Sequence, residues 1–150
     1  MKRFVVLDTS PAGIYCKNPS LPEVRGIRAW VSGLQRSGAI VVLPEIVDFE
    51  VRRKLLHLYL DASLERLNQM ATDLEYVKIT TATMQMAAQL WADARRRDRP
   101  TSGPRALDAD SILAAQAVLL AGPGDSVTIA TENVGHLGQF ADAQPWASIA

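Results

Sequence analysis

The sequence contains little of what most zinc and disulfide sites are made of: its 150 residues include one cysteine and two histidines. A single thiol, Cys16, excludes an internal disulfide framework and a cysteine-rich zinc site. We interpret Cys16 as a small apolar core residue. The two imidazoles, His57 and His136, lie far apart in the chain, which argues against a histidine-rich metal centre.

The chain also lacks an excess of charge and a long apolar run. Sixteen Lys and Arg residues balance sixteen Asp and Glu residues, so any contact with nucleic acid must come from a local basic patch. No stretch approaches the roughly 18 apolar residues of a membrane span. The first apolar run, residues 4–7, ends at Asp8 and is shorter than the roughly 7–15 residues of a secretory signal. We therefore expect a cytoplasmic protein without membrane contact.

Several common catalytic motifs are missing as well. The sequence has neither of the glycine-rich loops that cradle phosphate groups, G-x-G-x-x-G and G-x-x-x-x-G-K-[ST]. It has no G-x-S-x-G motif, and neither histidine stands in the context of a hydrolase triad. These absences argue against the commonest nucleotide-binding loops and against a serine hydrolase.

What the chain does contain is enough apolar sequence for a core: 48% of its residues are hydrophobic, which predicts one domain over residues 1–150. Short apolar runs alternate with segments whose apolar residues recur at helical spacing. The predicted strands are residues 4–7, 39–43, 76–79, 126–130 and, at an edge, 146–149. The predicted helices are residues 23–35, 44–59, 62–74 with Asp61 as cap, 80–96 and 107–121, with a loop at 98–105. This alternation predicts an α/β fold of three layers, α/β/α, around a mainly parallel central sheet.

Polar side chains follow the ends of several predicted strands or lie early in the next helix. In chain order they are Asp8, Glu50, Asp108, Asp110, Thr131, Glu132 and Asn133. Ligands of an open parallel sheet collect outside the carboxyl ends of its strands. We therefore expect these side chains, from four separate segments, to share one rim.

Each acid also has a purely structural explanation. Capping of free helical N–H groups would account for Asp8, Asp108 and Asp110. Glu50 can form a surface ion pair with Arg53 or Lys54, about one turn further along its helix. We interpret Glu45 and Asp48 as surface groups that interact favourably with the helix dipole.

Several carboxylates at one rim repel each other and are costly to bury unless a cation compensates their charge. Carboxylate and amide oxygens are hard ligands, and without nearby thiolates or imidazoles they favour Mg²⁺ or Mn²⁺ over zinc. Magnesium keeps several waters and also binds phosphate oxygens. The pattern therefore predicts phosphate-ester chemistry, in which a metal-bound water acts as the nucleophile.

Two groups of basic residues lie near these acids in the sequence. They are Arg52, Arg53 and Lys54 beside Glu50, and Arg95, Arg96, Arg97, Arg99 and Arg105 around the loop before the Asp110 helix. They can hold an anionic polymer, or they can be solvated residues that stabilise a helix C-terminus. The three tryptophans occupy apolar positions, so we expect them in the core and not as platforms for bases.

Four segments together resemble the motifs of a PIN domain of the kind found in VapC-type toxins of bacterial toxin–antitoxin pairs. They are FVVLDTS at residues 4–10, PEIVDFEVRRKL at 44–55, LDADSILAA at 107–115 and ATENVGHL at 130–137. The family's second motif places its acid before an apolar-Arg-Arg run, which selects Glu50 over Glu45. Its third places an Asp before an apolar-Ala-Ala helix, which selects Asp110 over Asp108. The fourth departs from the pattern, because many members have an Asp where this chain has the uncharged Asn133, and this puts a second metal position in doubt.

The resemblance implies a magnesium-dependent endoribonuclease with Asp8, Glu50 and Asp110 as catalytic residues. Asp8 and Asp110 would ligate the metal, with Thr9, Thr131 and Asn133 orienting ligands or water. We expect the RNA to contact Arg53, Arg97 and Arg99. The resemblance also implies a cognate antitoxin whose tail occupies the cleft, and a homodimer.

Two other functions fit the same residues. Asn133 and the zero net charge allow a catalytically silent PIN-like module that holds RNA or a protein partner. Acids at the rim of a parallel sheet also serve small-molecule phosphohydrolases and receiver domains. A receiver needs a lysine at the end of a late strand, and residues 127–131 contain none, so we rank this reading last.

Overall fold

The computed structural model describes residues 1–97 and 104–150 and places five strands in one parallel sheet. The strands are β1 (Arg3–Leu7), β2 (Ile40–Pro44), β3 (Glu75–Val77), β4 (Ser126–Ala130) and β5 (Ala143–Gln144). Their order is β3-β2-β1-β4-β5. The chain therefore builds outward from β1 in one direction and then in the other. The crevice between β1 and β4, where the order reverses, is the place at which such sheets bind ligands.

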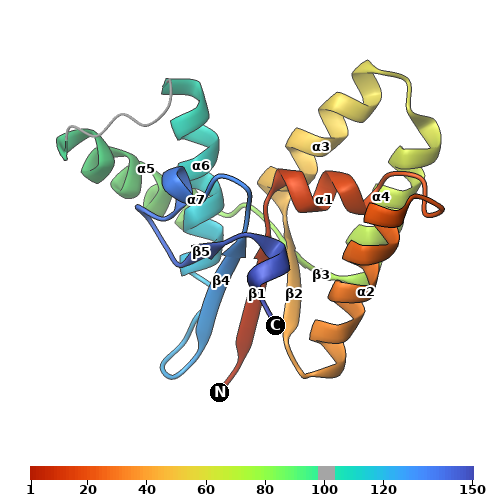
Figure 1. The fold of residues 1–150 in the computed structure, drawn as a ribbon. Helices are drawn as coiled ribbons and strands as arrows, with labels where there is room; N and C mark the ends of the chain where they lie inside the picture. The colour runs from red at the N-terminus through yellow and green to blue at the C-terminus, as the bar shows by residue number, and fades with distance from the viewer. Residues whose placement is uncertain (98–103) are drawn as a thin grey trace.

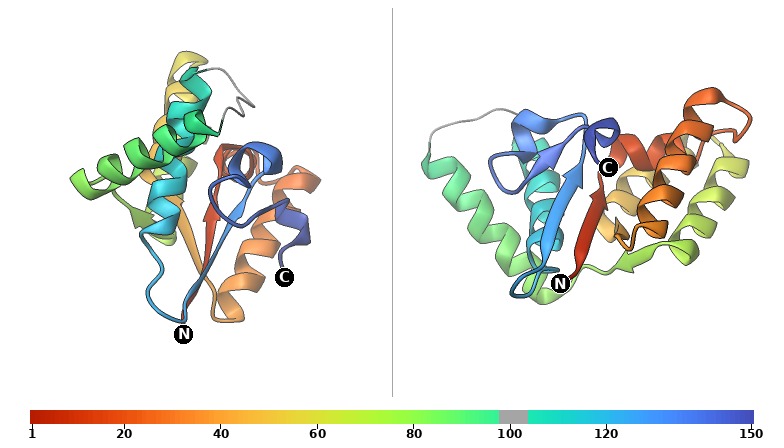
Figure 2. Two further views of the ribbon diagram at one scale, coloured as in Figure 1. Left: turned by 90° about the vertical axis from the view of Figure 1, so that its left-hand side faces the viewer. Right: turned by 60° about the horizontal axis from the view of Figure 1, so that its bottom comes forward.

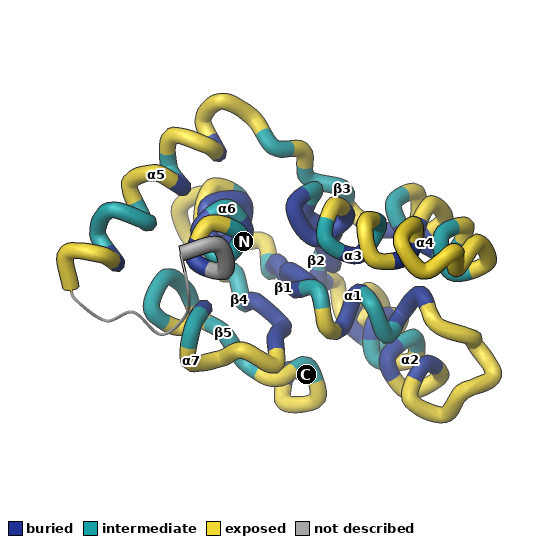
Figure 3. Tube along the Cα trace, turned by 90° about the horizontal axis from the view of Figure 1, so that it is seen from above, coloured by how far each residue is buried: buried dark blue, intermediate teal, exposed yellow. Residues whose placement is uncertain are grey.

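Helices cover both faces of this sheet. They are α1 (Thr9–Tyr15), α2 (Pro22–Arg36), α3 (Glu45–His57), α4 (Asp61–Asp73), α5 (Thr81–Arg96), α6 (Pro104–Val118), α7 (Val134–Leu137) and a 3-10 helix, η1 (Trp146–Ser148). Figure 1 shows the strands between α1–α4 and α5–α7, and the two further views of Figure 2 agree. Seen from above, α1 and α2 lie on one side of the sheet and α5 and α6 on the other (Figure 3). The predicted α/β/α arrangement around a parallel sheet is confirmed.

The central strands form the middle of the core. Val5, Val6 and Leu7 of β1 and Val42 and Leu43 of β2 are all fully buried. Such continuous apolar runs suit strands that are covered on both faces. The strands thus fix the positions at which the residues after them, Asp8 among these, emerge at the carboxyl edge.

Other sequence predictions about the core also agree with the structure. Cys16 is fully buried, with Sγ 3.9 Å from the sulfur of Met70, and burial raises the pKa of its thiol to about 11. The rings of Trp30 and Trp146 pack against each other at 5.4 Å between centroids.

The predicted edge strand at residues 146–149 is wrong. The last strand is β5, and residues 146–148 form η1 instead. Pro145 precedes this turn with φ −58° and accepts a hydrogen bond from the Ser148 N–H. Proline has no N–H to donate to a sheet and favours the entry to a helical turn, so the chain curls where the sequence suggested pairing.

Three predicted helix ends also move. The helix predicted at 107–121 begins at Pro104, a residue suited to a first turn, so Pro104 and Arg105 are not loop, and residues 98–103 lie outside the described residues. The helix predicted to end at residue 59 stops at His57, because Tyr59 adopts a left-handed φ of 55°. Asp61 is not a cap: it is the first residue of α4, after Leu60. Among the described helices, none has the length and apolar character that crossing a membrane requires.

Candidate functional site

A pocket of about 640 Å³ opens at the carboxyl ends of β1 and β4. Its walls come from α1, α3, the start of α4, α6 and the segment after β4. The three acids selected from the sequence, Asp8, Glu50 and Asp110, all line it, and so do Thr9 and Asn133. The fold therefore brings together side chains that are as many as 125 positions apart in sequence.

Asp8 is the most firmly held of the three acids. It is 8% exposed and follows β1 directly. Its Oδ1 accepts a hydrogen bond of 2.7 Å from the Thr9 N–H, and its Oδ2 accepts one of 2.6 Å from the Thr131 hydroxyl. Asp8 is thus the cap of α1 and a pocket residue at once, so the two interpretations offered by the sequence both hold.

Glu50 is also a pocket residue and an ion-pair partner. Its Oε1 accepts a 3.0 Å hydrogen bond from the Thr9 hydroxyl, and Oε2 lies 3.7 Å from Nη2 of Arg53. Burial raises the pKa of Glu50 and the nearby charge of Asp8 adds to this, while the Thr9 hydroxyl and Arg53 oppose it. The two favourable partners do not offset burial, so the carboxylate is under-compensated.

Asp110 is the seventh residue of α6, which begins at Pro104, and is therefore not a helix cap. The capping explanation for Asp108 is wrong for the same reason. Burial raises the pKa of Asp110 to about 6, with Asp8 and Glu50 adding to the effect and His136 opposing it. Nδ1 of His136 lies 3.9 Å from Oδ2 of Asp110, too far for a hydrogen bond.

Thr131 and Asn133 support the pocket from behind and from its rim. Thr131 is fully buried, donates its hydroxyl proton to Asp8 and accepts a 2.8 Å hydrogen bond from the Asn133 N–H. The Asn133 side chain is exposed and lines the pocket. Thr131 therefore orients Asp8 without facing the pocket itself.

The donor set suits a cation that takes few protein ligands. In residues 1–97 and 104–150, no three Asp, Glu, His or Cys side chains are grouped closely enough to hold a metal ion by themselves. A closed zinc site commonly uses four such ligands, and these residues present no such group. Mg²⁺ commonly uses one or two carboxylates and keeps several waters. Burial, followed by the charges of Asp8 and Glu50, raises the pKa of Asp110, and a bound cation would compensate this negative charge.

Arg53 and Arg97, two of the three arginines selected from the sequence, do not line this pocket. Arg53 is 61% exposed; it pairs with Glu50 and lies over the Phe49 ring at 5.1 Å from its centroid. Arg97 is exposed at the end of α5. Arg99 lies outside the described residues. Their roles in binding RNA stay predictions.

Five polar side chains that line the pocket were not among the site residues selected from the sequence: Ser10, Lys17, Lys54, Ser63 and His136. Lys54 carried a signal, because it lies one helical turn after Glu50 and so shares its face. His136 stands three residues after Asn133 in the fourth motif segment, but nothing in the sequence relates it to Asp110. Lys17 becomes a pocket residue only through the packing of α1 on α3.

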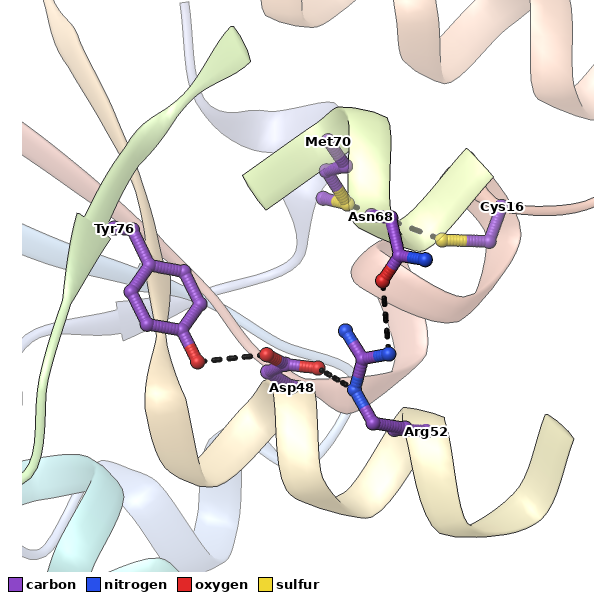
Figure 4. Close-up of polar contacts among 6 residues, drawn as sticks. All are labelled: Cys16, Asp48, Arg52, Asn68, Met70 and Tyr76. Atoms are coloured by element: carbon purple, nitrogen blue, oxygen red, sulfur yellow. Dashed lines mark hydrogen bonds and ion pairs between the residues drawn. The ribbon is translucent and has the colours of Figure 1, made fainter. Parts of the chain in front are cut away.

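Asp48 and Glu45 differ from their prediction as surface dipole partners. Asp48 is 7% exposed and accepts hydrogen bonds from Arg52 Nε at 2.9 Å and the Tyr76 hydroxyl at 2.6 Å (Figure 4). Arg52 in turn donates to Asn68 at 2.8 Å. Glu45 is half-buried and accepts a 2.8 Å hydrogen bond from the Ile79 N–H. Both acids tie α3 to the β3 segment.

No family model and no curated protein sequence matches the chain. Solved structures do match it over nearly its whole length. A chain in the structure of VapBC2 from Rickettsia felis bound to a DNA fragment from their promoter has 14% identity and a TM-score of 0.68, with 95% of this chain and 98% of that chain covered. A chain of VapBC-1 from nontypeable Haemophilus influenzae has 17% identity and a TM-score of 0.69. A chain of DNA-bound VapBC from Salmonella typhimurium has 19% identity and a TM-score of 0.69. In both cases 97% of this chain and 99% of that chain are covered. At these identities the likeness shows the fold, which is the PIN-domain fold of the VapC type that the four sequence motifs predicted.

Proposed function

We propose that this protein is the toxin of a bacterial toxin–antitoxin pair and that it hydrolyses RNA phosphodiesters with Mg²⁺, or Mn²⁺, as cofactor. One observation carries the proposal: three carboxylates from β1, α3 and α6 converge on one pocket where the strand order reverses, and two of them have raised pKa values. Carboxylates that repel each other in a pocket are a mark of functional sites. The fold shared with chains of VapBC complexes supports the same assignment.

In the proposed site, Asp8 and Asp110 hold the cation. A bound divalent cation would activate a water and neutralise charge that develops on the phosphoryl oxygens. The Thr9 N–H and the Thr131 hydroxyl fix the two oxygens of Asp8, each of which retains a second lone pair for a ligand. The Thr9 hydroxyl holds Glu50, which completes the acidic pocket.

The test is cleavage of a structured RNA by the purified chain, with Mg²⁺, with Mn²⁺ and with EDTA. Replacing either proposed ligand, in Asp8→Asn or Asp110→Asn, should reduce the rate by about 100-fold or more, because a metal contributes several kcal/mol to charge stabilisation. The matched control is Asp93→Asn, since Asp93 lies on α5, outside the pocket, and its side-chain partners among the described residues are Arg96 and Gln89. Cleavage that persists in both site variants, or in EDTA, would refute the assignment.

The partner and the assembly belong to the same proposal. We propose that an antitoxin protein binds the pocket, as the presence of VapB and VapC in one structure suggests for the neighbours, and that the chain forms a homodimer in the cytoplasm. Co-purification with the product of a small neighbouring reading frame should suppress RNA cleavage. Light scattering of the free chain should give twice its mass of 16.4 kDa. A monomer, or a co-purified product without effect on cleavage, would contradict these parts.

A second candidate function is a catalytically silent module of the same fold that binds RNA or protein. Two features favour it: Asn133 brings no charge to the pocket, and the described residues offer no group of three metal-binding side chains. Calorimetric titration with Mg²⁺ and Mn²⁺ separates the two functions. Binding at millimolar concentration that Asp110→Asn abolishes supports the enzyme, whereas no binding supports the silent module.

A further inference from the structure

The pocket continues beyond its acids along α1 and α3, two helices that contact each other (Figure 1). The lining residues on the α1 side are Thr9, Ser10, Gly13, Ile14 and, just after the helix, Lys17; those on α3 are Glu50, Val51, Lys54 and Leu55. Residues three and four apart share one face of a helix. Both rows therefore lead from the Thr9–Glu50 hydrogen bond toward a lysine.

Both lysines are available to an anionic ligand. Lys54 is exposed and has no ion-pair partner in the part of the chain that the structure describes. Lys17 lies 3.2 Å from Glu23, and both side chains are more than half exposed. An exposed ion pair of this kind contributes little to stability, so a phosphate can replace Glu23 at small cost.

The two ends of the pocket suit different parts of one ligand. The acidic end accepts phosphate only with a cation, whereas the lysine end accepts an anion directly. Lys54 lies four residues after Glu50, about 6 Å along the helix axis. Between the two ends the walls are apolar or open, formed by Ile14, Val51 and the bare backbone of Gly13. A ligand with anionic groups separated by flat, partly apolar groups matches this order, and a nucleic-acid strand has that character.

We propose that Lys17 and Lys54 are positioning residues that bind backbone phosphates of the RNA strand next to the cleaved phosphate. The intervening nucleoside would lie between the acidic end and the lysines, against the apolar wall formed by Ile14 and Val51. The assignment rests on the proposed function, because the cleaved phosphate defines where the strand enters. An acidic peptide could also meet the two lysines, but it would leave the apolar wall without a matching group.

The salt dependence of RNA binding tests the lysines directly. Affinity of the full chain for a fluorescein-labelled oligouridylate is measured by anisotropy in EDTA over a range of salt concentrations. Each of Lys17→Gln and Lys54→Gln should reduce the slope of log K against log salt by about 0.7, the value for one phosphate contact with a single strand. Lys78→Gln is the control, since Lys78 is exposed and does not line the pocket. An unchanged slope in the double variant, or an equal change in the control, overturns the assignment.

A steric test is independent of charge. A Cβ added at Gly13 or at Gly26 meets nothing within 4 Å, and beyond it Gly13 faces the pocket and Gly26 faces solvent. Leucine also favours helices more than glycine does, so both Gly13→Leu and Gly26→Leu should fold. Only Gly13 lines the pocket. Gly13→Leu should therefore weaken oligouridylate binding several-fold while Gly26→Leu leaves it unchanged. Equal binding by the two variants overturns the assignment.

Two further outcomes separate this inference from the proposed function. If oligoglutamate of matched charge competes as well as oligouridylate and loses affinity in the same lysine variants, the lysine end of the pocket binds acidic peptide and the RNA assignment is wrong. If the salt slope depends on the lysines but no Mg²⁺-dependent cleavage occurs, the RNA-binding role of the lysines is supported and the enzyme proposal fails. Where cleavage occurs, the lysine variants should raise KM with little change in kcat, as expected for uniform substrate binding.

Discussion

Two acids on one helix, Asp48 and Glu50, show how differently the same chemical group is used in this molecule. They are two residues apart in α3 and so, at about 100° per residue, point about 160° apart around its axis. Asp48 lies among Arg52, Tyr76 and the β3 segment, where both of its oxygens accept short hydrogen bonds (Figure 4). Glu50 faces a pocket that it shares with three other acids, Asp8, Asp110 and Glu132.

The two acids differ in how well neighbouring groups compensate their negative charge, and not only in how far they are buried. A buried carboxylate that is paired and hydrogen-bonded is part of the architecture, and removing its partners is costly. A half-buried carboxylate surrounded by like charge is held in place by the rest of the fold at a cost in stability. The two clusters should therefore respond in opposite directions when an acid is neutralised or removed.

The largest effect is expected in the compensated cluster. Asp48→Ala leaves the Tyr76 hydroxyl and Arg52 Nε without their acceptor, so the free energy of unfolding should fall by about 2–3 kcal/mol. The control, Asp93→Ala, removes a half-exposed acid whose partners Arg96 and Gln89 are exposed, and it should change stability by less than about 0.5 kcal/mol. Urea denaturation of both variants measures the difference. Equal losses would mean that the hydrogen bonds of Asp48 add nothing to its burial.

The partners of Asp48 also explain why the sequence did not predict its burial. An acid in the first turn of a helix usually lies at the surface and interacts with the helix dipole. The residues near Asp48 in the sequence do not indicate that it will bind Tyr76, which is 28 positions away. Lys54 was visible only as a neighbour of Glu50, because its place in the pocket depends on how α1 packs against α3. Contacts of this kind depend on how two helices or strands are placed relative to each other, and the sequence did not predict them.

What was predicted correctly depends on local pattern and parallel topology. The apolar run of β1 and the β-branched run of β4 set two strand ends, and a parallel sheet brings those ends to one edge. Asp8 and Thr131 follow directly, and the structure joins them by a hydrogen bond. The start of α6 was misplaced because Pro104 was assigned to a loop, which made Asp110 look like a possible cap. Its position within the helix removes that alternative and leaves the pocket as its environment.

A smaller effect of opposite sign is expected for Asp110→Asn. Burial and the charges of Asp8 and Glu50 raise the pKa of Asp110 to about 6. The carboxylate is still mostly ionised at pH 7, but it is less stable in the folded pocket than in the unfolded chain. Neutralising it should increase the free energy of unfolding by on the order of 1 kcal/mol in EDTA. The control is Asp108→Asn, an exposed acid on the same helix, which should change little. If Asp110→Asn instead destabilised the protein, Asp110 would, like Asp48, stabilise the fold.

The pH dependence of stability should show the same charge. Asp110 titrates near its ordinary pKa of 3.8 in the unfolded chain and at about 6 when folded, so the folded state binds more protons between these values. The free energy of unfolding should therefore fall as pH rises from about 4 to about 6, by on the order of 1 kcal/mol more in the parent than in Asp110→Asn. Urea titrations at several pH values in EDTA measure this difference. Parallel profiles for the two proteins would contradict the assigned shift.

The smallest change in stability is expected for Glu50→Gln, and it is the sharpest test of the distinction between the two acids on α3. Glutamine still accepts the Thr9 hydroxyl proton, the exposed contact with Arg53 at 3.7 Å is worth little, and the repulsion from Asp8 disappears. These small changes oppose each other, so the free energy of unfolding should shift by less than about 0.5 kcal/mol, as for Glu65→Gln on the exposed face of α4. RNA cleavage should nevertheless be lost if Glu50 serves the proposed reaction. A large loss of stability would instead mean that Glu50, like Asp48, is held for the fold, and the acidic pocket would then have one functional carboxylate fewer.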